Sequence, residues 1–119
     1  MSVLDYEHFI ATVQHEAGIP KKQAERAVAA TLATLAERIS GGEAGDIAKQ
    51  LPTELRRLLA DGSNAQAFDL EEFLRRVAER EGVTLDNAEQ HARAVFSALG
   101  RTVGHDEIAD MASELPPGL

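Results

Sequence analysis

The sequence repeats itself. When it is shifted by 64 positions, residues 5–55 align with residues 69–119 without a gap, and 15 of the 51 pairs are identical. Ordinary composition gives roughly four identities by chance in such a comparison. Many of the other pairs keep their hydrophobic or charged character. We therefore interpret the chain as a single domain, residues 1–119, made of two repeats (5–55 and 69–119) that are joined by the linker 56–68.

Within each repeat, apolar residues recur at the three- and four-residue intervals of an amphipathic helix. The stripe of the first helix contains Tyr6, Phe9, Ile10, Val13 and Ala17, and its counterpart in the second repeat contains Leu70, Phe73, Leu74 and Val77. Gly18 and Gly82 are expected to end these helices. A long helix of about 20 residues is expected next, followed by a short one that stops at Pro52 or Pro116.

The architecture that follows is all-α: a duplicated three-helix unit with six to seven helices, because the stretch TELRRLLA after Pro52 is expected to add a helical turn or two. A stack of repeats generally needs at least about three copies to bury its own core. We therefore expect the two units to pack face to face about a pseudo-twofold axis and to share one core. Phe9 and its counterpart Phe73 are expected near this axis or at equal distances from it. The same holds for Leu32 and Phe96.

Composition bears on several classes of function. The chain has 20 acidic and 12 basic side chains and a formal net charge of −8, which argues against a broad phosphate-neutralising surface and so against nucleic acid as a partner. It has no cysteine, which excludes a disulfide framework and a thiolate site. No apolar run reaches the length of about 20 residues that spans a membrane, and the first residues lack the features of a signal peptide. We expect a cytoplasmic protein without a membrane partner.

The repeats share a pattern in which F-x-x-x-V-x-x-x-x-G is followed by Ile or Val, then by A-E and a long helix rich in alanine. The pattern continues with G-G-E and L-P-x-x-L in the first repeat. With it the chain resembles the bacterial family known as domain of unknown function 2267 (DUF2267) over nearly its whole length. The most specific stretches are RISGGEAGDIAKQLPTEL and FDLEEFLRRVAEREGV. The resemblance implies an all-helical duplicated domain with no agreed activity, and it assigns no catalytic residue.

A second resemblance is local. Residues 6–43, YEHFIATVQHEAGIPKKQAERAVAATLATLAERISGGE, are similar to the N-terminal helical hairpin of the histone-like HU proteins. In that family DNA is held by β-ribbon arms that follow the hairpin. This sequence has neither the basic arm nor the glycine-rich turn that precedes it, so the resemblance implies a similar packing of the helical body and does not carry the DNA function over.

The stretch DGSNAQAFDLEEF, residues 61–73, reads like a calcium-binding loop that runs into a helix. Counted from its first aspartate as a twelve-residue loop, it has Ala65 at a ligand position and Gln66 where the turn requires glycine. Asp69 and Glu72 instead have the spacing of a helix N-cap with an acid in the first turn. We interpret the stretch as a linker and a helix cap, and expect no metal there.

No catalytic, cofactor-binding or metal site is expected elsewhere. His8 and His15 share a helix face, but their seven-residue separation is about 10 Å along the axis, too far for one metal ion. Acids present in both repeats lie mostly in the first turns of helices, where negative charge is favoured by about 0.3–1 kcal/mol. The sequence contains no G-x-S-x-G, Walker or G-x-G-x-x-G motif. We therefore do not expect an enzyme.

The candidate contact site is a basic patch of Lys21, Lys22 and Arg26. Further candidates for such patches are Arg56, Arg57, Arg75, Arg76 and Arg80. The acids interleaved along these helices favour a salt-bridged surface instead. The function that fits best is a non-enzymatic helical module that acts through contacts with a protein partner or through self-association as a homodimer. Two alternatives stay open. One is a nucleic-acid-binding, nucleoid-associated-like protein, suggested by the HU-like hairpin and the basic patch. The other is a binder of a small apolar ligand between the helix layers.

Overall fold

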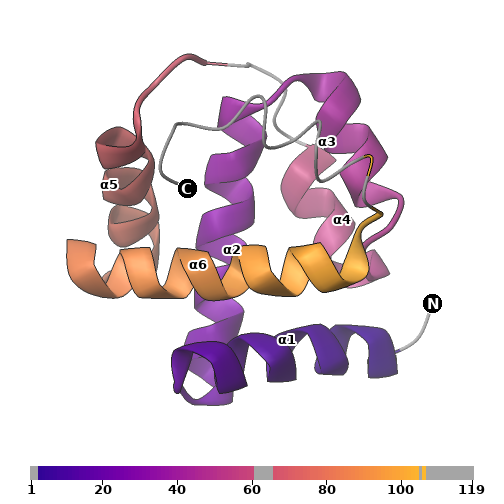
Figure 1. The fold of residues 1–119 in the computed structure, drawn as a ribbon, viewed down its shortest axis with the longest axis horizontal. Coiled ribbons are helices and arrows are strands. Elements are labelled where there is room, and N and C mark those ends of the chain that lie inside the picture. The colour runs from indigo at the N-terminus through magenta and orange to yellow at the C-terminus, as the bar shows by residue number, and fades with distance from the viewer. Residues whose placement is uncertain (1–2, 61–65, 105, 107–119) are drawn as a thin grey trace.

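The computed structural model describes residues 3–60, 66–104 and 106. These residues form six helices and no strand (Figure 1). The helices are α1 (Val3–Ala17), α2 (Lys21–Arg38), α3 (Gly41–Ala48), α4 (Thr53–Ala60), α5 (Leu70–Glu81) and α6 (Leu85–Thr102). The all-α fold predicted from the sequence is confirmed. The third helix expected in the second repeat, and its end at Pro116, lie outside the described residues, as does the part of the linker that spans 61–65.

The long helices α2 and α6 have the bounds that a shift of 64 positions gives, since each spans 18 residues and the shift carries one onto the other. Gly18 and Gly82, which follow α1 and α5, both adopt the left-handed conformation, with φ of 67° and 77°. Glycine enters this region without the Cβ clash that penalises other residues, so it ends both helices as predicted. The division of the whole chain into two repeats stays a prediction.

The third helix ends earlier than expected. Its start is capped by Ser40, whose Oγ accepts a hydrogen bond of 3.2 Å from the Glu43 backbone N–H. It ends at Ala48, four residues before Pro52. Proline has no backbone N–H, so it cannot donate the helical hydrogen bond to the carbonyl of Ala48. The backbone N–H of Leu51 donates instead to the carbonyl of Ala48, in a tighter turn. The Leu51 side chain stays buried, with a relative exposure of 2%.

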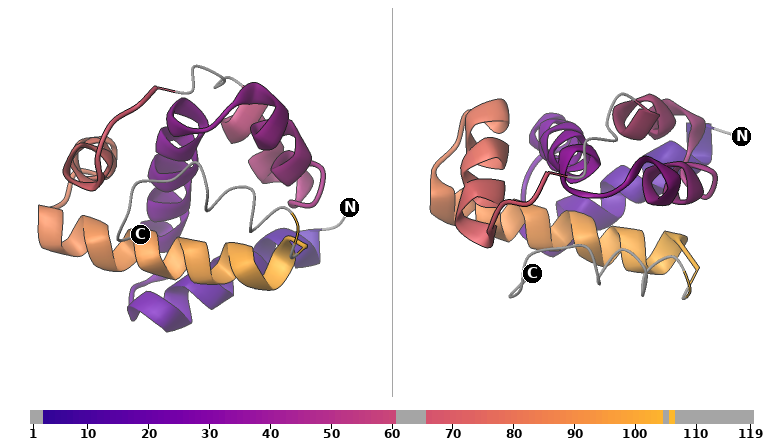
Figure 2. Two further views of the ribbon diagram at one scale, coloured as in Figure 1. Left: turned by 45° about the horizontal axis from the view of Figure 1, so that its top comes forward. Right: turned by 90° about the horizontal axis from the view of Figure 1, so that it is seen from above.

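Helix α2 lies at the centre of the arrangement. It contacts α1, α4, α5 and α6, and α5 lies on one side of it while α3 and α4 lie on the other, in each of the three views (Figures 1 and 2). Helix α6 also packs on α1 and on α5. A shift of 64 positions relates α1 to α5 and α2 to α6. The contact of α1 with α6 therefore corresponds to the contact of α5 with α2, and both contacts are present. The pseudo-twofold axis itself stays a prediction.

The hydrophobic core consists of two clusters, and each cluster takes residues from both halves of the chain, as expected of a core that the halves share. The larger cluster joins α1, α2, α3, α4 and the second half of α6, and it contains Phe9 and Leu32. The smaller cluster lies where α5 meets α2 and the first half of α6, and it contains Phe73. Phe96 is partly exposed and packs against both clusters. Phe9 and Phe73 therefore belong to different clusters, Phe73 to the one that α5 forms with α2 and α6.

Candidate functional site

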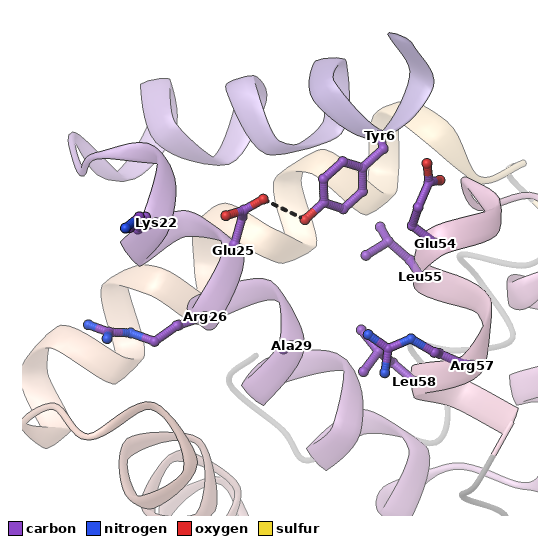
Figure 3. A pocket seen from close by; sticks show the side chains of 9 residues that line it. All are labelled: Tyr6, Lys22, Glu25, Arg26, Ala29, Glu54, Leu55, Arg57 and Leu58. Carbon is purple, nitrogen blue, oxygen red and sulfur yellow. Dashed lines mark hydrogen bonds between the residues drawn. The ribbon is translucent and has the colours of Figure 1, made fainter. Parts of the chain in front are cut away.

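A groove with a volume of about 690 Å³ runs between α1, α2 and α4 (Figure 3). Helix α4 borders it because its apolar face packs on α2, which leaves its charged residues beside the opening. The groove is lined by Tyr6, Lys22, Glu25, Arg26, Ala29, Glu54, Leu55, Arg57 and Leu58. Helix α2 therefore supplies one wall and α4 supplies the other, with the Tyr6 ring of α1 between them at one end (Figure 3).

The Tyr6 hydroxyl donates a hydrogen bond of 2.8 Å to Oε2 of Glu25 and so ties α1 to α2 within the groove (Figure 3). Burial of the phenol, together with the hydrogen bond to the Glu25 carboxylate and its negative charge, raises the pKa of Tyr6 from 10.0 to about 12. The hydroxyl is therefore protonated at neutral pH and serves as a donor. One of the two carboxylates in the groove is engaged in this way, and the other, Glu54, is exposed.

The three residues of the predicted basic patch divide between two environments. Lys21 lies beside Glu7, with 3.0 Å between Nζ and Oε1, and the hydrogen bond to that carboxylate raises the pKa of Lys21. Lys22 and Arg26 line the groove, where Arg57 of α4 joins them. Within the part of the chain that the structure describes, none of these three groove cations forms an ion pair. The structure thus moves the candidate site from the predicted patch to a groove that shares two of its residues.

Sequence reasoning named Arg57 only as a further candidate for a basic patch, and it did not join Arg57 or the apolar residues of α4 to Lys22 and Arg26 in one site. The stretch TELRRLLA is predicted to be helical, but the alignment of residues 5–55 with 69–119 covers only its first three residues. The repeat therefore carried no information about where this helix packs. Its strong amphipathic pattern was the available signal, since Leu55 and Leu59 are four residues apart, on one face of the helix, and both are buried.

The arginines of α5 show the opposite behaviour from the groove cations. Arg75 and Arg76 both bind the carboxylate of Glu72, with nitrogen–oxygen distances of 2.7 Å. Arg76 and Arg80 also bind Glu37 of α2, at 3.1 and 2.8 Å. The hydrogen bonds from Arg75 and Arg76 lower the pKa of Glu72 to about 2. The pKa of Glu37 is also lowered, mainly by its hydrogen bond from Arg80. This face is a salt-bridged surface of the kind that the interleaved charges predicted.

The stretch that reads like a calcium loop ends in a helix cap. Oδ1 of Asp69 accepts a hydrogen bond of 2.9 Å from the backbone N–H of Glu72 at the start of α5. The Glu72 carboxylate is bound by two arginines, so both acids already have partners. The interpretation as a cap is confirmed for this part, while Ala65 and the residues before it to position 61 lie outside the described residues. In the described ranges no group of three or more potential metal-ligating side chains lies together.

One buried polar pair was not predicted. Nδ1 of His91 in α6 lies 2.5 Å from Oε2 of Glu81, the last residue of α5, and their relative exposures are only 3% and 5%. Burial raises the pKa of the Glu81 carboxyl, while the charges of His91 and Arg26 act in the opposite direction. The second oxygen of Glu81 is buried without a hydrogen-bond partner among the described residues. The pair joins α5 to α6, and neither of its residues lines the groove.

The comparisons with known proteins assign no activity to these features. No curated protein matches the chain. None of the helices in the described ranges has the length and apolar character of a membrane span. The model of the family described as "Uncharacterized conserved protein (DUF2267)" matches residues 6–119, nearly the whole sequence. The chain belongs to the DUF2267 family.

Proposed function

We propose that this protein is a non-enzymatic helical module that acts by binding another polypeptide, and that its binding face is the groove between α1, α2 and α4. The observation that carries the proposal is the combination of three cations without ion pairs among the described residues, Lys22, Arg26 and Arg57, with apolar side chains between them. A surface cation beside apolar groups gives a partner both charge complementarity and area to bury.

The lining of the groove favours binding over catalysis. It offers charged, aliphatic and phenolic groups, but no serine, threonine or histidine, so the usual nucleophile and base pairs are not among its described residues. The groove is also open along one side, whereas pockets for small ligands typically enclose about 70–90% of the ligand surface. These features support an extended partner such as a polypeptide segment over the small apolar ligand.

Nucleic acid is the weaker candidate for the same groove. Phosphate binding is supported by runs of cations that neutralise successive phosphates. Here Glu25 and Glu54 lie among the three cations, and Lys21, the remaining member of the basic patch, is paired with Glu7. With a net charge of −8 on the whole chain, long-range attraction to a polyanion is also unfavourable.

The test immobilises three forms of this protein and compares the polypeptides that each form captures from a cell lysate. One is the wild type, the second carries Lys22→Glu and Arg57→Glu, and the third is a control with Arg93→Glu. Arg93 is an exposed arginine of α6 that pairs only with Glu89 among the described residues and lies outside the groove. Neither Lys22 nor Arg57 has an ion pair to lose, so circular dichroism melts should show all three proteins folded.

We expect that the wild type and the Arg93→Glu control capture a polypeptide that the variant with Lys22→Glu and Arg57→Glu, the groove variant, does not capture. Sedimentation of the purified proteins covers self-association: a wild-type dimer that the groove variant cannot form would identify the partner as a second copy. If every captured protein binds the three baits equally, and all three sediment as monomers, the groove is not a protein-binding face and the proposal fails.

A further inference from the structure

Each wall of the groove carries a cation, and a strip of apolar groups lies between the walls. Lys22 stands on α2 and Arg57 stands on α4, whereas the guanidinium of Arg26 is directed away from α4 (Figure 3). From this arrangement we infer that the occupant is an acidic amphipathic segment of the partner, with carboxylates directed to both walls and aliphatic side chains directed to the strip. The inference rests on the proposed function and specifies the chemistry of its partner.

The charge balance of the groove supports an acidic occupant. The lining contains three cations and two carboxylates, so it carries one net positive charge although the chain carries −8 overall. One carboxylate, Glu25, already accepts the hydrogen bond from Tyr6, which leaves Glu54 as the acid without this contact. A locally cationic groove on an acidic protein attracts carboxylates and repels basic segments over short range, where salt does not fully screen the charges.

The apolar strip supports an amphipathic occupant rather than a purely acidic one. The Tyr6 ring, Ala29 and Leu58 are each only partly buried, whereas Leu55 beneath them is 3% exposed. A partner can therefore cover the first three side chains and gain about 25 cal/mol for each Å² of apolar surface that is removed from water. Anions without an apolar face would leave this strip exposed to solvent.

The same charge pattern does not occur at the equivalent positions of the second half of the chain. A shift of 64 positions carries Lys22 onto Asp86 and Arg26 onto Gln90. The arginines that α5 does present are bound to glutamates, as described above. Among the described residues, this pattern of charges therefore occurs only in the groove of α1, α2 and α4, and we expect one acidic segment per chain rather than two.

The test selects binding sequences from a displayed library of random peptides, with the wild type as target and with the Lys22→Glu, Arg57→Glu variant for counter-selection. Enriched peptides that combine Asp or Glu with aliphatic residues, and that are lost on the variant, are the expected result. Groove-dependent peptides that are basic or uncharged would overturn the inference while leaving the proposed function intact. Selection that yields no groove-dependent peptide would overturn both.

Affinity is then measured through Tyr6, because the chain has one tyrosine and no tryptophan and this tyrosine lines the groove. A synthetic peptide from the selection, free of tyrosine and tryptophan, should change the tyrosine emission and bind the double variant at least about tenfold more weakly. The affinity should fall as salt rises. A version with Lys in place of each acid should bind the Lys22→Glu, Arg57→Glu variant better than the wild type, and equal binding to both proteins would refute the charge pairing.

Discussion

The buried pair of Glu81 and His91 makes a sharp prediction, because the chain itself indicates what can replace it. A shift of 64 positions places Glu81 on Ala17 and His91 on Ala27, so the first half has two alanines where the second has a buried pair. Ala27 is fully buried, with a relative exposure of 0%. The packing of the first two helices therefore does not require charge at these positions, and the cost of altering the pair depends on whether one partner or both are removed.

The single change His91→Leu leaves the Glu81 carboxylate buried without its partner. Loss of one member of a buried ion pair costs about 3–5 kcal/mol. The change Glu81→Met leaves a buried neutral imidazole with one unsatisfied nitrogen, for which we expect about 1–3 kcal/mol. The double variant removes both polar groups and refills the volume, and such replacements are often neutral or stabilising by about 1–4 kcal/mol. We expect it to be no less stable than the better of the two single variants.

The pH dependence gives a second readout with a defined sign. Burial raises the folded-state pKa of the Glu81 carboxyl above its ordinary value of 4.5, so the folded protein binds a proton at this site more tightly than the unfolded chain does. Any destabilisation by the buried carboxylate is therefore absent below pH 4.5 and grows as pH rises through the raised pKa. Without His91, which lowers this pKa, the deficit of His91→Leu relative to wild type should be small in mild acid and largest at neutral pH.

Urea unfolding followed by far-ultraviolet circular dichroism, at a series of pH values, measures both effects on the four proteins of the cycle. The reasoning predicts a coupling free energy of more than about 2 kcal/mol at neutral pH. It would be refuted if the double variant lost as much stability as the two single variants together. It would also be refuted if His91→Leu cost less than about 1 kcal/mol at every pH, as for a solvated pair.

Three further predictions concern the fold. Tyr6 should titrate near pH 12 by tyrosinate absorbance, and because its folded pKa lies above the unfolded value of 10.0, the stability that it contributes should be lost between these values in the wild type but not in Tyr6→Phe. Gly82→Ala should cost about 1 kcal/mol in urea unfolding because of the positive φ, whereas Gly100→Ala, in open space within α6, should stabilise by about 0.5–1 kcal/mol. Phe73→Ala should cost about 3–5 kcal/mol in the same assay, since its side chain is fully buried, and a cost below about 1 kcal/mol would contradict its core position.

The helices could be predicted from the sequence because the signals that set their ends are local. Gly18 and Gly82 end α1 and α5 through their own backbone conformation. Ser40 and Asp69 start α3 and α5 through a side chain that reaches three residues along the chain. Each of these signals needs only its neighbours in sequence. The end of α3 was predicted less well. The helix was expected to continue to Pro52, but it ends at Ala48, about one turn earlier.

The groove could not be predicted in the same way because its walls come from segments far apart in sequence. Arg57 lines the same groove as Lys22 and Arg26 only because α4, which follows α3 in the chain, packs back on α2. The sequence shows that α4 has an apolar face, but that face fits any apolar surface of similar shape. The pattern of charges did predict the pairing of the α5 arginines, since their partner Glu72 lies within a helical turn.

The buried pair had a signal in the sequence that the repeat makes readable. The apolar stripe of the first helix includes Ala17, and the equivalent position of the second half holds Glu81. A charged residue on a stripe that packs inward requires a buried partner. Its partner then has to come from a facing helix, and His91 is the polar residue that replaces buried Ala27 of the first half. Comparison of the two halves therefore draws attention to Glu81 and His91, because each of them occupies a position that holds alanine in the first half.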